Sequence, residues 1–350
     1  MSEAVQVAIV GCAHRPHAWS YARALASSPT ARLVGVFDED PALGHSVADD
    51  FGAPWTDDLD SLLRTDGLEA VVVCSPTVQH RGHVAAAARA GLHVLCEKPL
   101  TTTSADGLAA VAACRDAGVQ LHVAFVSRFL PHVRSVKRTL DSGALGDVVG
   151  LRAGNRGRPP LPPTYPAWIT RREESGGGAL IDHSVHLTDL VRHLTGHEVT
   201  QVAAETGTLL WDIEVEDCAL LSLVLDGGAV AGLDPSWSVP ANNPWDYDFF
   251  LRLVGTAGSV DLDDLAESVR VVSAGTGDGL RLAGFAEDPD AAMIENFCAS
   301  VRAGEPLAPA ATGEDGLRAL DVALAAYASS AAGARFVVPG SPGSPGSPAP

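Results

Sequence analysis

The first third of the chain alternates short apolar runs with longer segments in which apolar residues recur every three or four positions. The short runs have the length of buried strands, and the longer segments have the period of helices. Strands are predicted at residues 5–10, 32–37, 70–74, 93–96 and 119–125, and helices at residues 18–26, 41–50, 80–90 and 104–117. Such alternation with short connections indicates βαβ units. Residues 1–126 are therefore predicted to form an α/β domain with a parallel sheet.

The pattern changes after residue 128. Strand-like runs now follow one another with few helices between them, which is typical of a mostly antiparallel sheet. Strands are predicted at residues 148–153, 199–206, 219–225, 229–233, 249–254 and 269–272, and helices at residues 291–302 and 314–332. Residues 127–338 are predicted to form an α+β domain with a mostly antiparallel sheet. Residues 339–350 contain a Gly-Ser-Pro repeat without an apolar anchor and are predicted to be disordered.

The charge balance restricts the partners. The 350 residues include 24 Lys and Arg against 43 Asp and Glu, a net charge of −19, which repels phosphate backbones and anionic membranes. The N-terminus has no basic segment before its short apolar run, and no run of about 18 apolar residues occurs. We predict a cytoplasmic protein that binds neither nucleic acid nor membranes.

Six cysteines are scattered singly through apolar runs, without CxxC spacing. Disulfides and zinc sites are therefore not expected. Cys12, Cys74 and Cys96 fall near predicted strand ends and could line one cleft, but small buried hydrophobic side chains account for them more simply.

The first predicted strand runs into the sequence Gly-Cys-Ala-His-Arg-Pro. A dinucleotide-binding turn has the pattern GxGxxG, which lets backbone amides and a helix N-terminus meet the pyrophosphate. Only Gly11 of the three glycines is present, because Ala13 and Pro16 take the other two positions. Ala13 adds one methyl group, and Pro16 can occupy the first position of a helix, whose amide would have no partner within the helix. Residues 1–126 are thus predicted to be a Rossmann domain, with cofactor contacts from Gly11, Cys12, Ala13, His14 and Arg15.

The second predicted strand ends in Asp38-Glu39-Asp40, about 27 residues after Gly11. A carboxylate at this place accepts hydrogen bonds from the adenosine ribose. A ribose phosphate would face it as a like charge, at a cost of roughly 3 kcal/mol for a pair about 5 Å apart at an effective dielectric constant of about 20. Asp38 therefore predicts NAD rather than NADP. The alternative, an acidic start of a helix, accounts for Asp40 but not for Asp38.

A third feature follows the strand predicted at residues 93–96. Pro99 cannot continue a ladder, so the strand ends before it and leaves Lys98 at its carboxyl end. In an open parallel sheet, ligands bind at that end of the strands. Lys98 is therefore predicted to meet a substrate, although a surface lysine is the simpler alternative for an isolated residue of this type.

With these pieces in place, the chain resembles the Gfo/Idh/MocA family of glucose-fructose oxidoreductases and inositol dehydrogenases over residues 4–338. The motifs that carry the resemblance are VGCAH, SPTVQH (75–80), CEKP (96–99) and GGGALIDHSVHLTDL (176–190). Departures are Ala13 and Pro16 in the glycine turn and Thr77 where asparagine is usual. The resemblance implies a Rossmann domain, a second domain with an open sheet, a nicotinamide cofactor and the oxidation or reduction of sugar-like alcohols.

The resemblance also implies roles for particular residues. Lys98 matches the lysine of the family's EKP motif, and Glu97 is expected near the nicotinamide ribose. Asp182 and His186 match the aspartate and histidine of its G-G-x-x-x-D-x-x-x-H motif. The further cofactor contacts expected from these motifs are Ser75, Pro76, Thr77, His80, Glu97, Lys98 and Pro99.

The chemistry requires these residue types. Oxidation of a secondary alcohol needs a base for the hydroxyl proton, and imidazole titrates near neutral pH, which suits His186. Lys98 can stabilise the charge that develops on oxygen. Asp182 lies four residues before His186, so both lie on one helix face if a helix begins here, and Asp182 can then orient Lys98 or the substrate hydroxyl. The alternatives are a helix cap for Asp182 and a core histidine for His186. A metal site that includes His183 is disfavoured, because a lysine and a nicotinamide mechanism leave a metal little to do.

Four residues are further candidates for substrate contact, each with a structural role or surface solvation as the alternative. They are Arg128, Asn155, Trp168 and His183. The leading hypothesis is an NAD-dependent dehydrogenase acting on a sugar, cyclitol or related polyol, assembled as a homodimer or homotetramer. The alternatives are a hydrolase or eliminase that uses NAD transiently, and a ligand sensor that has lost catalysis. Lys98, Asp182 and His186 together argue against the sensor.

Overall fold

The computed structural model describes residues 4–342 except 244–245, 264–267, 273–279 and 285–286. The chain forms two compact units, each assembled from three segments. The first comprises Met1–Phe129, Pro160–Gly178 and Pro289–Leu320, and the second comprises Leu130–Pro159, Ala179–Asp288 and Asp321–Pro350. The first crossing, at Phe129, lies near the predicted boundary at residue 126, but the chain then returns to the first unit twice. Of the predicted tail, residues 343–350 lie outside the described residues.

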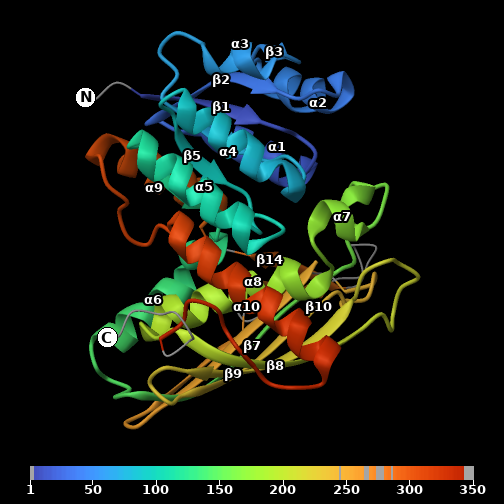
Figure 1. Cartoon of the computed structure of the whole chain (residues 1–350), viewed down its shortest axis with the longest axis vertical. Coiled ribbons are helices and arrows are strands. Elements are labelled where there is room, and N and C mark those ends of the chain that lie inside the picture. The colour runs from blue at the N-terminus through green and yellow to red at the C-terminus, as the bar shows by residue number, and fades with distance from the viewer. Residues whose placement is uncertain (1–3, 244–245, 264–267, 273–279, 285–286, 343–350) are drawn as a thin grey trace. The chain divides into compact units, whose positions relative to one another are not determined.

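The first unit has a six-stranded sheet in the order β3-β2-β1-β4-β5-β6, in which all neighbouring strands are parallel (Figure 1). This is the order of a Rossmann fold, as predicted. The strands are β1 (Val5–Val10), β2 (Ala31–Phe37), β3 (Trp55–Thr56), β4 (Ala70–Val73), β5 (His93–Cys96) and β6 (Leu121–Val123). The helices are α1 (Arg15–Ser27), α2 (Pro41–Phe51), α3 (Leu59–Leu63), α4 (His80–Arg89), α5 (Ser104–Ala117), α7 (Arg172–Ser175) and α9 (Pro289–Ala303), with 3₁₀ turns η1 (Thr77–Gln79), η2 (Val126–Phe129) and η3 (Ala167–Thr170).

Local sequence explains where these elements begin and end. All four residues of β4 are buried, because helices cover both faces of a parallel sheet. Helix α2 begins after Asp40, whose side chain accepts a hydrogen bond of 2.8 Å from the Ala42 amide. The helix ends at Gly52, which adopts a φ of 65° that other residues rarely reach. Strand β3 has only two residues and leaves no periodic signal in the sequence.

The second unit has a seven-stranded sheet in the order β12-β11-β7-β10-β9-β8-β15. Only β7 and β10 pair in parallel, so the predicted mostly antiparallel sheet is confirmed. The strands are β7 (Val148–Gly157), β8 (Val199–Gly207), β9 (Cys218–Leu225), β10 (Val230–Ser236), β11 (Tyr247–Gly255), β12 (Ser259–Asp263) and β15 (Phe336–Val337), with a separate hairpin of β13 (Ser268–Val272) and β14 (Leu280–Gly284). Its helices are α6 (Pro131–Asp141), α8 (Ala179–Thr195) and the second half of α10 (Gly313–Ala332). Helices α6 and α8 were not among the elements predicted from periodicity.

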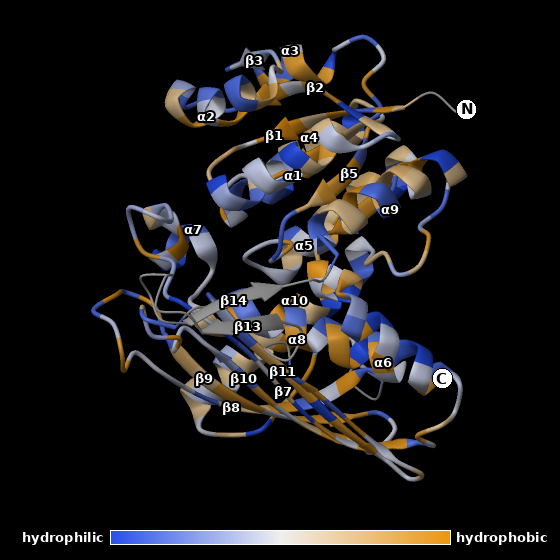
Figure 2. Cartoon of the chain, turned by 180° about the vertical axis from the view of Figure 1, so that it is seen from behind, coloured by the Kyte–Doolittle hydropathy of each residue, from blue (hydrophilic) through white to orange (hydrophobic). Residues whose placement is uncertain are grey.

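One face of this sheet packs against α8, and the other is open. Leu151 and Ala153 of β7 are buried, whereas Arg152 between them is exposed. The same alternation continues on β9 and β10 and gives the strands their mixed colouring in Figure 2. A strand with one buried face needs such a period of two, and this period made the strands predictable.

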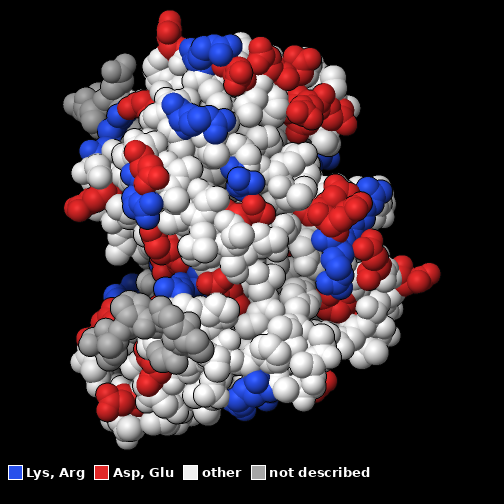
Figure 3. All heavy atoms as spheres, in the orientation of Figure 1, with Lys and Arg blue, Asp and Glu red and all other residues white. Residues whose placement is uncertain are grey.

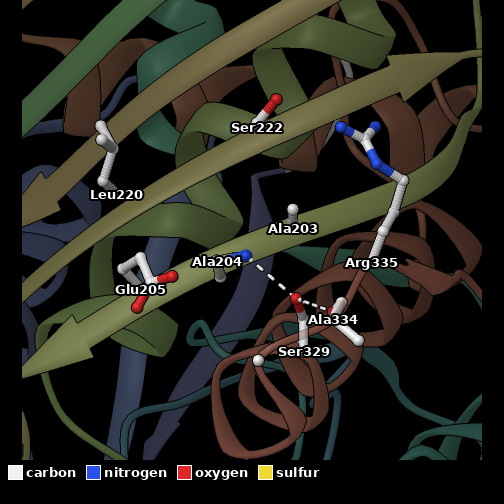
Figure 4. A pocket seen from close by; sticks show the side chains of 9 residues that line it. Ala203, Ala204, Glu205, Leu220, Ser222, Ser329, Ala334 and Arg335 are labelled. Carbon is white, nitrogen blue, oxygen red and sulfur yellow. Dashed lines mark hydrogen bonds between the residues drawn. The ribbon is translucent and has the colours of Figure 1, made fainter.

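The outer edge of β8 is only partly paired, since β15 contacts just Gln201 and Val202. Beyond that point, Ser329 of α10 accepts a hydrogen bond of 3.0 Å from the Ala204 amide and donates one of 2.6 Å to the Ala334 carbonyl. A shallow cavity of about 240 Å³ lies beside these residues (Figure 4). A side chain thus satisfies an edge amide that a further strand would otherwise bind.

Acidic and basic side chains are interspersed on the face shown in Figure 3, and no broad basic area is visible there among the described residues. Within the described part of the chain, none of the helices combines the length and the apolar character that a membrane span requires.

Candidate active site

The glycine turn follows β1 at the centre of the parallel sheet. Gly11 has a φ of 82°, and a Cβ atom there would lie 2.7 Å from the backbone of Ser75, so both the conformation and the space require glycine. Its amide donates a hydrogen bond of 2.8 Å to the carbonyl of Phe37. Helix α1 begins at Arg15, so Pro16 is its second residue, one position later than predicted but still within the first turn. The turn therefore has the form of a dinucleotide-binding loop although two of the three glycines are missing.

Asp38 lies beside this turn and braces it. Its carboxylate accepts hydrogen bonds from the amides of Cys12 at 2.6 Å and Asp40 at 2.8 Å. Burial raises the pKa of the Asp38 carboxyl, and the two amide bonds oppose the rise. An ionised carboxylate has about four acceptor sites, so these two bonds leave capacity for ribose hydroxyls.

A cavity of about 200 Å³ adjoins the Asp38 carboxylate. Its lining comprises Gly11, Ala13, Phe37, Asp38, Glu39, Asp40, Leu43, Ser75, Pro76, Gln79 and His83. His83 was not predicted from the sequence. Burial, followed by the charge of His80, lowers the pKa of His83 to about 4, so this ring is neutral near pH 7 and offers no positive charge to a phosphate. The cavity fits the adenosine half of NAD better than that of NADP.

His80 lies behind the cavity and is 1% exposed. Its Nε2 atom lies 3.0 Å from the carbonyl of Ser75, and its Nδ1 atom lies 3.0 Å from that of Pro99. The ring thus joins the loop after β4 to the loop that contains Lys98. This arrangement positions both loops, and a direct cofactor contact of His80 stays a prediction.

Glu97 and Lys98 follow β5 and are both buried, at 2% and 8% exposed. The Glu97 carboxylate accepts hydrogen bonds from Tyr21 at 2.5 Å, His17 at 2.8 Å and the Lys98 amide at 3.0 Å. Burial alone would raise the pKa of Glu97, but the charge and hydrogen bond of His17, with the charges of His14 and Lys98, hold it well below its usual value. Burial would likewise lower the pKa of His17, and the charge and hydrogen bond of Glu97 raise it instead.

His17 and Tyr21 are residues of this site that the sequence analysis missed. Both belong to α1, four positions apart, so they lie on one helix face. Their spacing was readable, but nothing in the sequence showed that this face meets the end of β5. Glu97 was expected near the nicotinamide ribose, and the structure commits its carboxylate to α1 and to the backbone of Lys98.

Trp168 belongs to the first unit, although it follows the first strand of the second. Its indole N–H donates a hydrogen bond of 3.1 Å to the carbonyl of Ala13, and its ring lies 6.1 Å from that of His14. Trp168 was proposed as a platform for a sugar ring. Its observed partner is the glycine turn, so its position favours a role in shaping the cofactor loop.

Arg128 is 5% exposed, and its guanidinium donates a hydrogen bond of 2.8 Å to the carbonyl of Ala310 and lies 3.4 Å from Asp315. These contacts hold η2 to the segment that precedes α10. The observed partners of Arg128 indicate a structural role. A substrate contact of Arg128 stays a prediction without support from the geometry.

Helix α8 of the second unit carries Asp182, His183 and His186. It follows three glycines, of which Gly176 has a φ of 87°. Glu216 accepts hydrogen bonds from the first amides of the helix through its carbonyl at 2.9 Å and its side chain at 3.2 Å. Asp182 is the fourth residue of α8, and its carboxylate accepts from the Trp237 indole at 3.1 Å. It is therefore not the N-cap of this helix.

The two histidines of α8 are both buried, His183 at 4% and His186 at 7% exposed. The Nε2 atom of His183 lies 3.2 Å from the Asp182 carboxylate, and its Nδ1 atom lies 2.8 Å from the Asn155 carbonyl. Asn155 thus takes part through its backbone. Its neighbour Arg156 lies on the open face of the sheet, paired with Asp248.

A glycine turn on a Rossmann sheet, with the Asp38 carboxylate beside a cavity of about 200 Å³, is typical of a dinucleotide-binding protein. Residues 5–125 match the model of an oxidoreductase family with an NAD-binding Rossmann fold, and residues 133–261 match that of the GFO/IDH/MocA C-terminal domain. The chain belongs to the Gfo/Idh/MocA family of NAD-binding oxidoreductases.

The relatives include enzymes with different reactions. The chain is 31% identical over 323 residues to inositol 2-dehydrogenase of Rhizobium meliloti (strain 1021), which covers 89% of this chain and 93% of the relative. It is 28% identical over 237 residues to 2,7-anhydro-N-acetylneuraminate hydratase of Mediterraneibacter gnavus, covering 67% of this chain and 61% of the relative. The crystal structure of GenD2 from gentamicin A biosynthesis in complex with NAD superimposes with a TM-score of 0.86 and 27% identity, covering 96% of this chain and 97% of that one.

Proposed function

We propose that this protein is an NAD-dependent dehydrogenase that oxidises a secondary alcohol of a sugar, cyclitol or related polyol. What carries the proposal is the presence of Lys98, Asp182 and His186 together in a chain similar over nearly its whole length to an inositol 2-dehydrogenase. A sensor that only binds a ligand has no need of all three.

Each residue has a distinct task in this proposal. NAD, when bound, accepts the hydride. His186 takes the hydroxyl proton, because a neutral imidazole is a good base near pH 7. Lys98 stabilises the negative charge that develops on the oxygen. Asp182 holds the substrate hydroxyl or Lys98 in the reactive orientation.

The adenosine half of NAD is assigned to the cavity beside Asp38. The carboxylate accepts ribose hydroxyls there, and the N-terminus of α1 faces the pyrophosphate. Gly11 supports this assignment, because a side chain at its position would clash with Ser75 and displace the turn from the cavity.

The direct test is the appearance of NADH absorbance when the purified protein meets NAD and a panel of cyclitols, aldoses and alditols. Turnover with at least one of them, and higher activity with NAD than with NADP, is expected. No NADH from any compound, together with tight binding of one of them, would support a sensor instead.

A second candidate rests on the relative named as a hydratase. Such an enzyme would oxidise its substrate transiently, eliminate or add a group, and return the hydride, so NAD would be regenerated. Substrate conversion without net NADH, monitored by mass spectrometry with a catalytic amount of NAD, would favour this candidate over the dehydrogenase.

We also propose that the protein assembles as a homo-oligomer through the open face of its second sheet. Leu220 of β9 and Val230 of β10 lie on this face, 62% and 55% exposed. Apolar side chains so exposed on adjacent strands are typical of an interaction surface. Size-exclusion chromatography with light scattering measures the molar mass of the protein in solution and tests this proposal. Leu220→Glu should shift this mass towards that of the monomer.

A further inference from the structure

The side chain of His83 forms part of the wall of the cavity beside Asp38. His83 is the fourth residue of α4 and is half-buried. Its Nδ1 atom lies 2.9 Å from Oγ of Ser75, and its ring meets that of Phe37 edge-on, with centroids 5.9 Å apart and an interplanar angle of 80°. Both partners are buried, Ser75 at 1% and Phe37 at 4% exposed. The two contacts therefore define the orientation of the imidazole ring.

The second ring nitrogen of His83, Nε2, has no hydrogen-bond partner among the described residues. Burial, followed by the charge of His80, lowers the pKa of His83 to about 4, so the ring is neutral near pH 7. A neutral imidazole has one nitrogen that donates and one that accepts, and the Ser75 hydroxyl can bind either kind at Nδ1. The Nε2 atom can therefore serve a ligand as donor or as acceptor.

The other polar side chains of the cavity leave a need for such a nitrogen. Residues 38–40 line the cavity with three carboxylates, which can only accept hydrogen bonds when they are ionised. The ring nitrogens N3 and N7 of adenine are also acceptors, so carboxylates cannot bind them. Of the other lining side chains with a donor, Ser75 is engaged with His83, and Gln79 is exposed. His83 is therefore the side chain best suited to meet a ring nitrogen of adenine.

We propose that His83 is a specificity-determining residue of the cofactor site, which binds the adenine ring of NAD through Nε2. This inference rests on the proposed function, in which the adenosine half of NAD occupies the cavity. Asp38 then recognises the ribose, and His83 recognises the base. Ser75 is a positioning residue, because its hydrogen bond to Nδ1 holds Nε2 in place.

The affinities for ADP and UDP, measured by isothermal titration calorimetry, separate a base contact from a ribose contact. The two nucleotides share the ribose and both phosphates and differ only in the base. His83→Leu removes both ring nitrogens, whereas His83→Gln keeps an amide that can donate or accept. His93→Leu is the matched control. His93 is also half-buried, and its Nδ1 accepts from the Gln120 amide at 3.1 Å, but it begins β5, at the opposite end of the strand from the cavity.

His83→Leu is expected to weaken the binding of NAD and ADP about 3- to 10-fold, the size of one neutral hydrogen bond, and to leave UDP binding unchanged. His83→Gln should recover part of the loss, and His93→Leu should bind all three nucleotides as the wild type does. Equal losses for ADP and UDP in His83→Leu would overturn the proposal, since the side chain would then act on the ribose or on the shape of the cavity. Unchanged ADP affinity in His83→Leu would overturn it as well.

Ser75→Ala tests the support of the ring. It removes the hydroxyl that holds Nδ1, so ADP should bind more weakly than to the wild type. The double variant with His83→Leu should bind ADP no more weakly than His83→Leu alone, because the hydroxyl acts through the ring. Additive losses would mean that Ser75 binds the nucleotide itself, which contradicts its role as a positioning residue.

Nitrogen NMR of the histidine-labelled wild-type protein tests the contact without a substitution. Addition of ADP should shift the Nε2 signal of His83, and addition of UDP should not; no shift with ADP would overturn the proposal. None of these measurements requires turnover. If no polyol is oxidised but ADP binding responds as expected, the dehydrogenase function fails and the contact of His83 with adenine stands. If polyols are oxidised and ADP binding ignores His83, the contact fails and the dehydrogenase function stands.

Discussion

At the scale of single residues, the Glu97 carboxylate illustrates how a charge is kept in a buried place. Three donors surround it, and the histidine among them is charged by the same contact. An ion pair between Glu97 and His17 stabilises the folded state only while both side chains are ionised. The stability of this pair must therefore depend on pH at both ends.

The pH range follows from the two pKa shifts. The pKa of Glu97 is lowered, so its contribution is present above the usual value of 4.5 and is lost as the pH falls. The pKa of His17 is raised, so its contribution is complete below 6.5 and is lost as the pH rises through its folded value. The pair of Glu97 and His17 therefore stabilises the fold most between pH 4.5 and pH 6.5.

We predict that His17→Gln lowers Tm more at pH 5.5 than at pH 9. At the lower pH His17 carries a charge that glutamine cannot replace, whereas at the higher pH His17 has lost this charge. Thermal denaturation of both proteins across this range measures the difference. His45→Gln is the control, since His45 forms an exposed pair with Asp49. A difference in Tm that does not change with pH would contradict the assigned ion pair.

Asp38 leads to a prediction about cofactor choice. NAD should bind more tightly than NADP, because a ribose phosphate would face the Asp38 carboxylate, and His83 offers no compensating charge. In Asp38→Asn, affinity for NAD should fall about tenfold, because a hydrogen bond to a charged acceptor, worth about 1.5 kcal/mol or more, is lost. The preference for NAD over NADP should become smaller, because the ribose phosphate no longer faces a negative charge. Fluorescence titration of both cofactors provides the values. Tighter NADP binding by the wild-type protein would show that another residue sets the preference.

At the scale of elements, helix α9 shows what a periodic pattern does and does not determine. Its apolar residues recur with helical spacing, and the helix was predicted at residues 291–302. Its partner was not predictable, because an amphipathic face fits any apolar surface. Met293, Ile294, Phe297 and Cys298 pack into the core of the first unit beside β1 and α1. Because α9 belongs to this core, the chain returns to the first unit after the strands of the second sheet.

Phe297→Ala should therefore destabilise the Rossmann unit. The side chain is 1% exposed, and removal of a buried phenylalanine costs about 3 to 5 kcal/mol. Leu108→Ala, at a site 58% exposed on α5, should change the free energy of unfolding by less than about 0.5 kcal/mol. Urea denaturation followed with bound NAD measures both. Similar values for the two variants would mean that α9 is not part of this core.

At the scale of the whole molecule, the sequence predicted the two sheets but not the path of the chain between the two units. Strand runs such as residues 93–96 could be located because burial on a sheet imposes a short apolar pattern. The residue types of the proposed site, such as Lys98, Asp38 and His186, were also readable from the sequence motifs. Their partners were not, since Tyr21 reaches Glu97 and Trp168 reaches Ala13 over long separations in the chain that leave no local signal.

We propose that the main role of Lys98 and His186 is to act on the substrate, so that binding of the cofactor depends little on either side chain. Steady-state turnover of an active polyol, measured alongside NAD titration for His186→Ala and Lys98→Met, tests this most directly. Loss of general acid-base catalysis should lower kcat by at least about 10² in His186→Ala. Lys98→Met should do likewise, since it keeps the length of the side chain and removes its charge, while NAD affinity changes only modestly in both. Near-normal turnover in either variant, or loss of NAD binding, would contradict the account.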